Sequence, residues 1–522
     1  MQIKQLSTYF VAAATIVHGL AITVVLATTD TYYTAAVFEF VQTQNCTMDP
    51  EDAKQVVKHN LDAYVPVAKL AKSKGADIID FPEYGIFPEC NRVQTQLFCE
   101  VIPDPDEGKC NPCMDQQQFA DRPQLITLSC MARNNSIVVH ANTCHIHRCE
   151  REPRCPPDGH MQFNTNVVFD RDGTLLIRYL KEHLYQEYAM NEPKRMQNPK
   201  FTTDFGTFLS YVCYDIFFER AIQVEKEDTV DGIVFSTMWE NTMPLLMTVG
   251  FFQSFVMGTN LTLIGADIQL PGQKAVGSGI FHGPYGALAY TFNPDGISKL
   301  VVARVPRRGY ALTEPKSSIT AVFENGTTFD YISDGDHVEM EGSENILPHW
   351  QNDYLENRYH VINMENYTLI KITEPSAYIE GCNNGLCCVL DYSAENITQN
   401  FYMAIFNGMQ ETFSDVHWSE ENCMLVRCDP ADGKECAAFP LRAEVVFHHV
   451  YLRANFSTQY IYPSVIGDRM RLIPRSQWEF SIALESGGYN GIINFNSDEG
   501  QKLIVVGFKG RCYDRDPPFS FF

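Results

Sequence analysis

The sequence predicts an α/β protein with two domains, a layered α/β domain followed by a mostly β domain. Three observations predict this organisation. The chain has 522 residues, which is enough for two or three domains that each bury a core. Short apolar runs alternate with helical stretches between residues 32 and 306. Beyond residue 306, clusters of Asn, Asp, Ser and Gly separate short apolar runs, a pattern typical of strands joined by turns.

The elements of the first domain follow from the spacing of its apolar residues. A helix is expected at 50–71, where apolar side chains recur at i, i+3 and i+4. Asp172 and Gly173 separate two apolar runs and predict a hairpin over 167–179. Further strands are expected at 35–40, 76–81, 208–212, 232–236, 261–266 and 300–305, and further helices at 217–224 and 243–258.

The second domain is expected to consist mainly of strands held together by disulfides, because seven cysteines lie in it. Its clearest strands are expected at 368–372, 388–391, 402–406, 444–450 and 503–508. The predicted boundaries are 1–27 for a signal peptide, 28–306 for the α/β domain, 307–320 for a linker and 321–522 for the β-rich base domain.

The amino terminus is typical of an exported protein. Lys4 provides a basic start, residues 10–26 are mostly apolar, and Val25-Leu26-Ala27 offers small residues for cleavage after Ala27. The alternative is an uncleaved membrane anchor, since the run lies at the short end of a spanning helix. No later apolar run is as long, and the carboxy end lacks the apolar tail of a GPI signal. We therefore expect a secreted protein without a stable membrane span.

Seven Asn-x-Ser/Thr sequons fit export, because such sites receive N-glycans in secreted proteins. Asn260 is a doubtful site because residues 255–266 are apolar enough to be buried. The remaining candidates are Asn45, Asn134, Asn325, Asn366, Asn396 and Asn455.

Charge and cysteine content restrict the partners and the compartment. Acidic residues exceed basic ones by 64 to 40, and the net charge of −24 makes nucleic acid an unsuitable partner. Seventeen cysteines indicate an oxidising compartment. Since that number is odd, pairing of all the others into eight bridges would leave one free thiol.

Two interpretations compete for the segment from Cys144 to Cys149, which contains His145 and His147 and lies close to Cys155. These residue types could hold zinc. In an exported chain, however, disulfides are the simpler explanation. The sequence therefore favours bridges, and no metal is expected.

Three chemically reactive side chains each follow an apolar run that is predicted to form a strand. They are Glu83, Lys181 and Cys213. Catalytic groups gather at strand ends because the sheet fixes their positions while the following loop stays open to substrate. Together a carboxylate, an ammonium and a thiol could form a nucleophilic site in which the carboxylate takes the thiol proton and the ammonium stabilises an oxyanion.

The stretches around these residues resemble the vanin and biotinidase branch of the nitrilase superfamily. In the first domain the similar stretches are FPEYGI at 81–86, DGHMQFNTNVVF at 158–169, RYLKEHLY at 178–185, CYDI at 213–216 and GSGI at 277–280. In the second they are 384–390, 425–428 and 455–460. The resemblance thus covers nearly the whole chain after residue 27.

The resemblance implies a nitrilase-like αββα sandwich with a β base domain, no cofactor, and hydrolysis of linear amides. It assigns Glu83 as general base, Lys181 as the cation that stabilises the oxyanion, and Cys213 as nucleophile. The N–H of Tyr214 would complete the oxyanion hole, and Glu187 corresponds to a second acidic residue that holds the lysine and the base in register.

The resemblance also extends to the pocket and to two disulfides. Trp239 matches a pocket-lining position, whereas Glu240 stands where family members tend to have an apolar residue. Relatives have bridges at positions like Cys113 to Cys130 and Cys149 to Cys155.

Two substrates remain open. One is pantetheine, cleaved to pantothenate and cysteamine, and the other is biocytin or another biotin amide. The spacing of Lys181 and Glu187 favours biotinidase, and residues 384–388 favour vanins, with pantetheine slightly preferred. A different class of function is a secreted binding or signalling protein that keeps the fold without turnover. A papain-like protease is excluded, because Cys213 lacks that family's glycine and tryptophan pattern.

Overall fold

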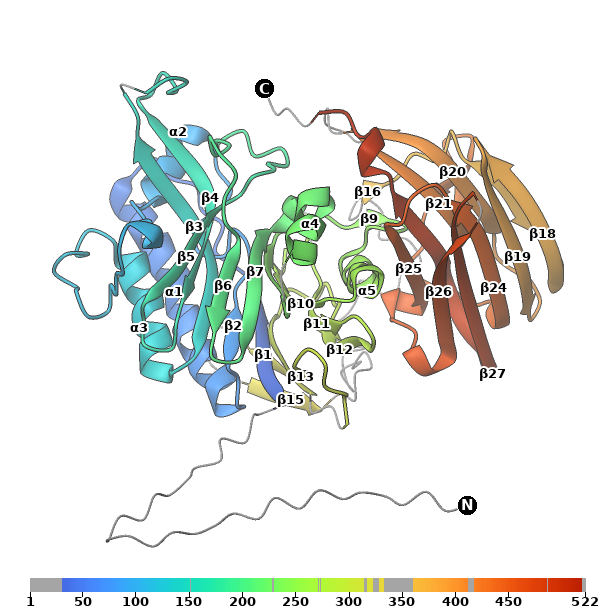
Figure 1. Cartoon of the computed structure of the whole chain (residues 1–522), viewed down its shortest axis with the longest axis horizontal. Helices are drawn as coiled ribbons and strands as arrows, with labels where there is room; N and C mark the ends of the chain where they lie inside the picture. Colours follow the sequence, from blue (N-terminus) through green and yellow to red (C-terminus); the bar gives the residue numbers. More distant parts are fainter. Residues whose placement is uncertain are drawn as a thin grey trace, which may run out of the picture. The chain divides into compact units, whose positions relative to one another are not determined.

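Two sheets packed face to face form the first half of the protein in the computed structural model (Figure 1). The structure describes residues 31–150, 152–227, 230–270, 272, 274–313, 317–322, 328–332, 360–411, 417–485 and 487–518. The first sheet has the strand order β15-β14-β13-β1-β2-β3-β4-β5. Its strands are β1 (Tyr32–Glu39), β2 (Ile78–Asp80), β3 (Val138–Arg148), β4 (His160–Phe169), β5 (Leu175–Leu180), β13 (Ser298–Pro306), β14 (Ser317–Val322) and β15 (Thr328–Ile332).

The second sheet has the order β12-β11-β10-β8-β7-β6. Its strands are β6 (Lys200–Thr203), β7 (Gly206–Val212), β8 (Gly232–Thr237), β10 (Thr262–Asp267), β11 (Ser278–His282) and β12 (Gly286–Thr291). Parallel pairing of β7 with β8 and of β8 with β10 brings the carboxyl ends of these strands to one edge.

Helices cover the outer face of each sheet. The helices α1 (Pro50–Ser73), α2 (Arg92–Thr95) and α3 (Pro123–Asn135) belong to the first layer, and α4 (Glu219–Glu227) and α5 (Thr248–Thr259) to the second. Helix α1 begins where the Asp49 side chain accepts hydrogen bonds from two backbone N–H groups, with Pro50 at its first position. None of the described helices is both long and apolar enough to span a bilayer.

The alternation of side chains along β1 explains the layering. Val37 packs in the core between the two sheets, while the next residue, Phe38, packs with the helix residues Leu61 and Leu125 on the other side. A strand whose two faces are both buried needs apolar residues at consecutive positions, and β1 supplies them from Ala35 to Phe38.

The second half is an antiparallel β structure with the order β17-β20-β21-β27-β24-β19-β18, in which β25 and β26 also pair with β27. The long strand β27 pairs with β24 and β26 in its first part and with β21 and β25 in its last part. The strands are β17 (Thr368–Ile372), β18 (Ser376–Asn383), β19 (Leu386–Ala394), β20 (Phe401–Glu411), β21 (His417–Arg427), β24 (Val446–Phe456), β25 (Ile461–Gly467), β26 (Trp478–Glu485) and β27 (Gly488–Arg511). A separate pair is formed by β22 (Asp429–Ala431) and β23 (Lys434–Ala438).

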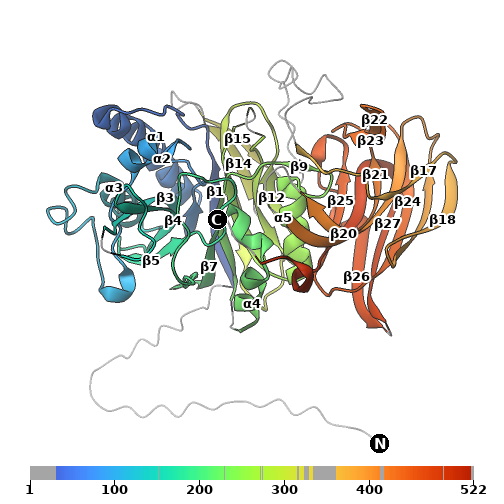
Figure 2. The same cartoon turned by 90° about the horizontal axis from the view of Figure 1, so that it is seen from above.

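The two halves pack against each other through α5 and β25, which lie side by side in both views (Figures 1 and 2). Arg511 on β27 donates to the carbonyl oxygen of Phe217 at 3.4 Å, and the hydroxyl of Tyr290 accepts from the N–H of Leu472 at 3.1 Å. A short parallel pair, β9 (Thr242–Met243) with β16 (His360–Val361), adds a backbone connection. The predicted class, an α/β sandwich followed by a mostly β domain, is confirmed.

Three expected elements differ from the structure. Residues 317–320 were predicted to belong to the linker, but they begin β14. Strand β15 lies in the predicted base domain. Both strands nevertheless extend the first sheet. Helix α5 begins at Thr248 rather than at 243, because residues 242–243 pair with β16 and a proline follows them. The predicted signal peptide, 1–27, lies outside the described residues.

The cysteines form seven bridges rather than the eight that parity suggested, and three cysteines are free: Cys110, Cys213 and Cys512. The predicted bridges Cys113–Cys130 and Cys149–Cys155 are present. The other bridges are Cys46–Cys90, Cys99–Cys144, Cys382–Cys387, Cys388–Cys423 and Cys428–Cys436. Cys144, Cys149 and Cys155 are therefore engaged as disulfides, and the described residues contain no cluster suited to a metal ion.

The sequon residues lie at the surface wherever the structure describes them. Asn260 is exposed as well, because it caps the carboxyl end of α5 with a left-handed backbone, although residues 255–257 and 261–266 around it are buried as expected. Asn325 lies outside the described residues. The exposed candidates are Asn45, Asn134, Asn366, Asn396 and Asn455.

Candidate active site

The three sequence-predicted reactive residues stand at strand ends that meet in one place. Glu83 follows β2 by three residues, Lys181 directly follows β5, and Cys213 directly follows β7. Cys213 starts the 3₁₀ helix Cys213–Phe217 with a backbone φ of 42°. A left-handed backbone is costly for a residue with a Cβ, and here it produces the sharp turn at which strand becomes helix.

Glu83 and Lys181 form a buried ion pair. The Lys181 Nζ lies 2.8 Å from Glu83 Oε1, and the two residues are 2% and 1% exposed. Burial raises the pKa of the Glu83 carboxyl, although the charge of Lys181 opposes this shift. Glu83 therefore accepts a proton more readily than an exposed glutamate does, which suits a general base.

A second carboxylate, Glu187, binds the same ammonium through Oε2. Its Oε1 accepts from the Tyr84 hydroxyl at 2.9 Å, and its Oε2 also accepts from the N–H of Tyr185 at 3.1 Å. Burial by itself would lower the pKa of Lys181, but Glu187 and Glu83 outweigh it and hold this pKa well above its usual value. Lys181 is consequently a permanent cation, located between two acids.

Asn164 on β4 connects the two carboxylates. Its Nδ2 donates to Glu83 Oε1 and to Glu187 Oε1, in both cases at 2.6 Å. Its Oδ1 accepts from Asn142 at 2.6 Å, and its carbonyl oxygen accepts from the N–H of Lys181 at 2.9 Å. One residue in the middle of a strand thus fixes both acids through its side chain and the Lys181 backbone through its carbonyl oxygen.

The thiol of Cys213 is buried and reduced. Its Sγ contacts the carbonyl oxygen of Met238 at 3.7 Å, and the N–H of Met238 donates to Glu83 Oε2 at 2.8 Å. The backbone of Met238 therefore contacts both the thiol, which follows β7, and the carboxylate, which follows β2. Burial and the charge of Glu83 raise the pKa of the thiol well above its usual value, and Lys181 opposes them. The resting thiol keeps its proton, so attack requires transfer of that proton to a base.

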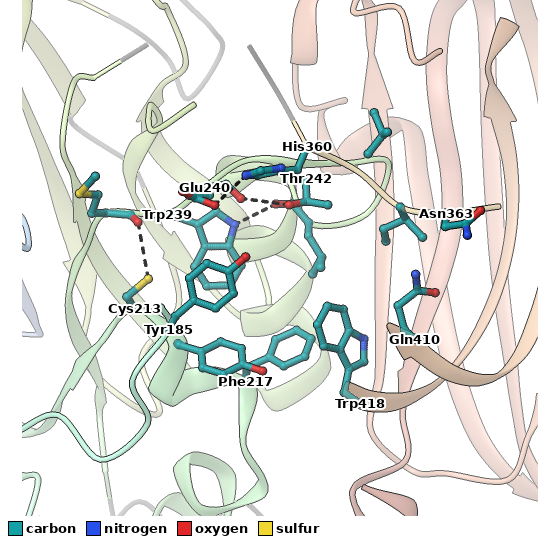
Figure 3. Close-up of a pocket in the computed structure, with 15 residues that line it drawn as sticks. Tyr185, Cys213, Phe217, Trp239, Glu240, Thr242, His360, Asn363, Gln410 and Trp418 are labelled. Atoms are coloured by element: carbon teal, nitrogen blue, oxygen red, sulfur yellow. Dashed lines mark hydrogen bonds and ion pairs between the residues drawn. The ribbon is translucent and has the colours of Figure 1, made fainter. Parts of the chain in front are cut away.

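The thiol opens into a cavity of about 310 Å³ between the two halves of the protein (Figure 3). Aromatic rings form much of its wall, including the sequence-predicted Trp239 and Tyr214. Trp239 is fixed by its indole N–H, which donates to the Leu246 carbonyl at 2.8 Å, and its ring stacks on Phe251. Tyr214 follows Cys213 in the 3₁₀ helix, so its N–H lies at the amino end of that helix, where an oxyanion is favoured.

Two family models match the chain. The family model described as carbon-nitrogen hydrolase matches residues 41–312, and the model of the vanin C-terminal domain matches residues 358–516. The chain belongs to the carbon-nitrogen hydrolase family. The predicted resemblance and the predicted class of enzyme, a hydrolase of amide carbon–nitrogen bonds, are therefore confirmed.

Several relatives match almost the full length of this carbon-nitrogen hydrolase. Human biotinidase is 30% identical over 498 residues, which are 93% of this chain and 90% of that protein. Human pantetheinase is also 30% identical, over 496 residues, with the same coverage of 93% and 90%. A solved amidase from Nesterenkonia sp. is 18% identical, covers 53% of this chain and 91% of its own, and superposes with a TM-score of 0.38.

Sequence reasoning missed several residues of the site. Asn164 lies within the stretch 158–169 but was given no role, because a strand interior does not mark a functional side chain. His360, Gln410 and Trp418 come from the second half of the chain and line the cavity. Spacing within the first domain gave no signal for them, since only the packing of the two halves brings them to Cys213.

Proposed function

We propose that this carbon-nitrogen hydrolase is a secreted amidohydrolase that cleaves linear amides of the pantetheine or biotin-amide type through a thioester on Cys213. The proposal is supported by relatives named biotinidase and pantetheinase and by the arrangement of Glu83, Lys181 and Cys213. The observation that contributes most is a reduced thiol at one end of a largely aromatic cavity, next to a buried base and a buried cation.

In the first step Glu83 takes the proton of Cys213 while the sulfur attacks the amide carbon. The resulting oxyanion would meet Lys181 and the N–H of Tyr214. Two of the three N–H donors of Lys181 are used by Glu83 and Glu187, which leaves one for the oxyanion. The carbon–nitrogen bond then breaks, and Glu83 returns its proton to the leaving amine.

In the second step a water molecule replaces the amine. Glu83 takes a proton from this water as its oxygen attacks the thioester carbon. The carbon–sulfur bond breaks, the carboxylic acid is released, and the thiol regains its proton from Glu83. Glu187 and Asn164 do not exchange protons in this scheme and serve to position Lys181 and Glu83.

The test mixes the purified protein with pantetheine and with biocytin and measures released cysteamine or lysine. We expect one of the two substrates to be cleaved and a thioester adduct to be detectable by mass spectrometry of the denatured protein at short times. Cys213→Ala should abolish turnover without unfolding the protein. Cys110→Ala, which removes another free cysteine away from the cavity, is the matched control and should keep full activity.

Wild-type activity in Cys213→Ala would refute the assigned nucleophile. No product from either substrate with the wild-type protein would instead favour a secreted binding protein on the same fold. The proposed export is supported by the predicted signal peptide and by the exposed sequons, and is tested by the appearance of glycosidase-sensitive protein in the culture medium.

A further inference from the structure

A charged cluster interrupts the aromatic wall of the cavity. Glu240 Oε2 lies 2.7 Å from His360 Nε2, and Lys274 Nζ lies 3.0 Å from the same nitrogen and 3.1 Å from His360 Nδ1. Glu240 and His360 line the cavity, and their side chains keep 31% and 17% of their surface exposed. Figure 3 shows the pair side by side on one wall. Both groups can therefore reach a bound molecule.

The cluster is built on a fixed backbone frame made of three segments. The N–H of His360 donates to the Asn241 carbonyl at 3.0 Å, which continues the β9–β16 pair. The fully buried Asn241 side chain donates to the carbonyl oxygens of Lys274 at 2.8 Å and Val276 at 2.9 Å. The backbone of Glu240 forms an isolated antiparallel β-bridge with the backbone of Ala275. The backbone therefore fixes the positions of Glu240, His360 and Lys274 relative to one another.

The cluster of Glu240, His360 and Lys274 differs from the rest of the cavity lining. Most of the other lining groups are aromatic or aliphatic, and the polar ones from the second half, Gln410 and Asn363, are uncharged amides. Charged side chains beside apolar walls are poorly solvated, so they bind opposite charges on a ligand more strongly than surface groups do. A carboxylate next to two basic groups matches a ligand that has an ammonium and a carboxylate on one carbon.

The substrate chemistry decides which side of the amide carries these charges. A biotinyl or pantothenyl acyl group is uncharged, so a charged part of the substrate must belong to the leaving amine. The amine released from pantetheine carries only a thiol besides its nitrogen, whereas a lysine attached through its side-chain nitrogen carries both charges of an α-amino acid.

We propose that Glu240, His360 and Lys274 form a subsite for the α-amino acid head of the leaving amine, with the ammonium at Glu240 and the carboxylate at His360 and Lys274. This inference rests on the proposed function, since it needs a scissile amide at Cys213. The three residues are specificity-determining and take no part in bond cleavage.

The test compares leaving amines of one length and different charge. The substrates are the N-pentylamide, the amide of 1,5-diaminopentane, the amide of 6-aminohexanoate and the Nε-lysine amide, each made with whichever acyl group, biotinyl or pantothenyl, the enzyme releases. We expect kcat/KM to be highest for the lysine amide, about tenfold above that for the pentylamide. Glu240→Gln should remove the advantage of an ammonium, and Lys274→Met the advantage of a carboxylate.

The pentylamide serves as an internal reference, because the ratio of kcat/KM for the lysine amide to kcat/KM for the pentylamide should fall in both variants. Glu365→Gln removes an exposed carboxylate far along the chain that pairs with Lys434, and it should change none of the rates. The subsite is refuted if the wild type cleaves all four amides equally, or if Glu240→Gln slows the pentylamide as much as the lysine amide. Failure of the wild type to release either acyl group would refute the proposed function instead.

Discussion

Each half of the protein contains a buried lysine paired with a buried glutamate, and only one of these pairs adjoins a thiol. In the first half Lys181 lies between Glu83 and Glu187, so acids outnumber the cation. In the second half Lys509 pairs with Glu420, and the neighbouring Arg511 pairs with Asp516. There each acid has its own cation.

The two environments shift the lysine pKa in opposite directions. Burial lowers the pKa of Lys509, and the single carboxylate of Glu420 does not compensate for it. The pKa of Lys181 is raised, because two carboxylates surround it. Glu420 is further satisfied by the Trp418 indole at 2.5 Å and by Asn422 at 2.7 Å. A buried ion pair is thus structural where its charges balance, and it becomes a candidate for chemistry where an excess acid faces a thiol.

The largest expected effect distinguishes the two lysines. Lys181→Met should lower kcat by about 10³-fold, since it removes the cation that faces the oxyanion. Lys509→Met should leave the chemical step intact but lower the free energy of unfolding by about 3 to 5 kcal/mol, because Glu420 stays buried without its partner. Steady-state kinetics and denaturant titration of both variants measure the contrast. Equal losses of activity at equal stability would show that the comparison is wrong.

The next effect concerns the two asparagines that donate to these acids. Asn164→Ala should lower kcat by about 10- to 100-fold with little change in KM, because Glu83 and Glu187 lose a shared donor. Asn422→Ala removes one donor from Glu420 and should leave kcat within about twofold. If Asn164 is only structural, Asn164→Ala will lower the free energy of unfolding without this selective change in kcat. In that case Asn164→Asp will have the same kcat as Asn164→Ala at every pH.

A smaller effect concerns stability in acid. Burial and then Arg178 lower the pKa of His145 to about 3, and its Nδ1 accepts from the N–H of Ile102 at 3.0 Å. The unfolded chain takes up a proton near pH 6.5, whereas the folded chain does not, so stability falls as the pH drops from about 6.5 towards 3. At pH 5 the cost is about 2 kcal/mol.

His145→Gln should therefore flatten the change in unfolding free energy between pH 7 and pH 5 by about that amount. His449→Gln, at a partly exposed histidine of the second half, is the control and should leave the slope unchanged. A slope that His145→Gln does not alter would contradict a neutral buried imidazole.

The smallest effect sharpens the assignment of the base. Because burial raises the pKa of Glu83, kcat/KM should decrease as the pH falls through that raised value, well before an ordinary glutamate with a pKa of 4.5 becomes protonated. The midpoint of this fall should lie above pH 4.5 in the wild type and in Lys509→Met alike. A midpoint at or below pH 4.5 would argue against Glu83 as the base.

The sequence predicts those parts of the site that follow directly from a strand. Glu83, Lys181 and Cys213 could be located because each ends an apolar run, and the structure brings them together. The length of β3 and β4 was not predicted, since buried polar residues such as Asn142 and Asn166 interrupt their apolar pattern. These residues are satisfied by each other rather than by water, which one-dimensional patterns do not reveal.

The remaining errors have spatial causes. Counting cysteines assumes that each finds a partner, but a bridge needs two Cα atoms within about 7 Å, and Cys512 is buried beside Arg515 instead. The Glu240–His360 contact joins residues that are far apart in the chain, and it exists only because β9 pairs with β16. Long-range pairing of two-residue strands leaves no trace in local composition.

The wall of the cavity formed by His360, Gln410 and Trp418 is made long after the nucleophile during synthesis. A growing polypeptide therefore contains Cys213 before the residues that wall off its thiol have been made, and the four disulfides of the first half can form during that interval. The later half then covers this one sulfur and limits its exchange with those disulfides.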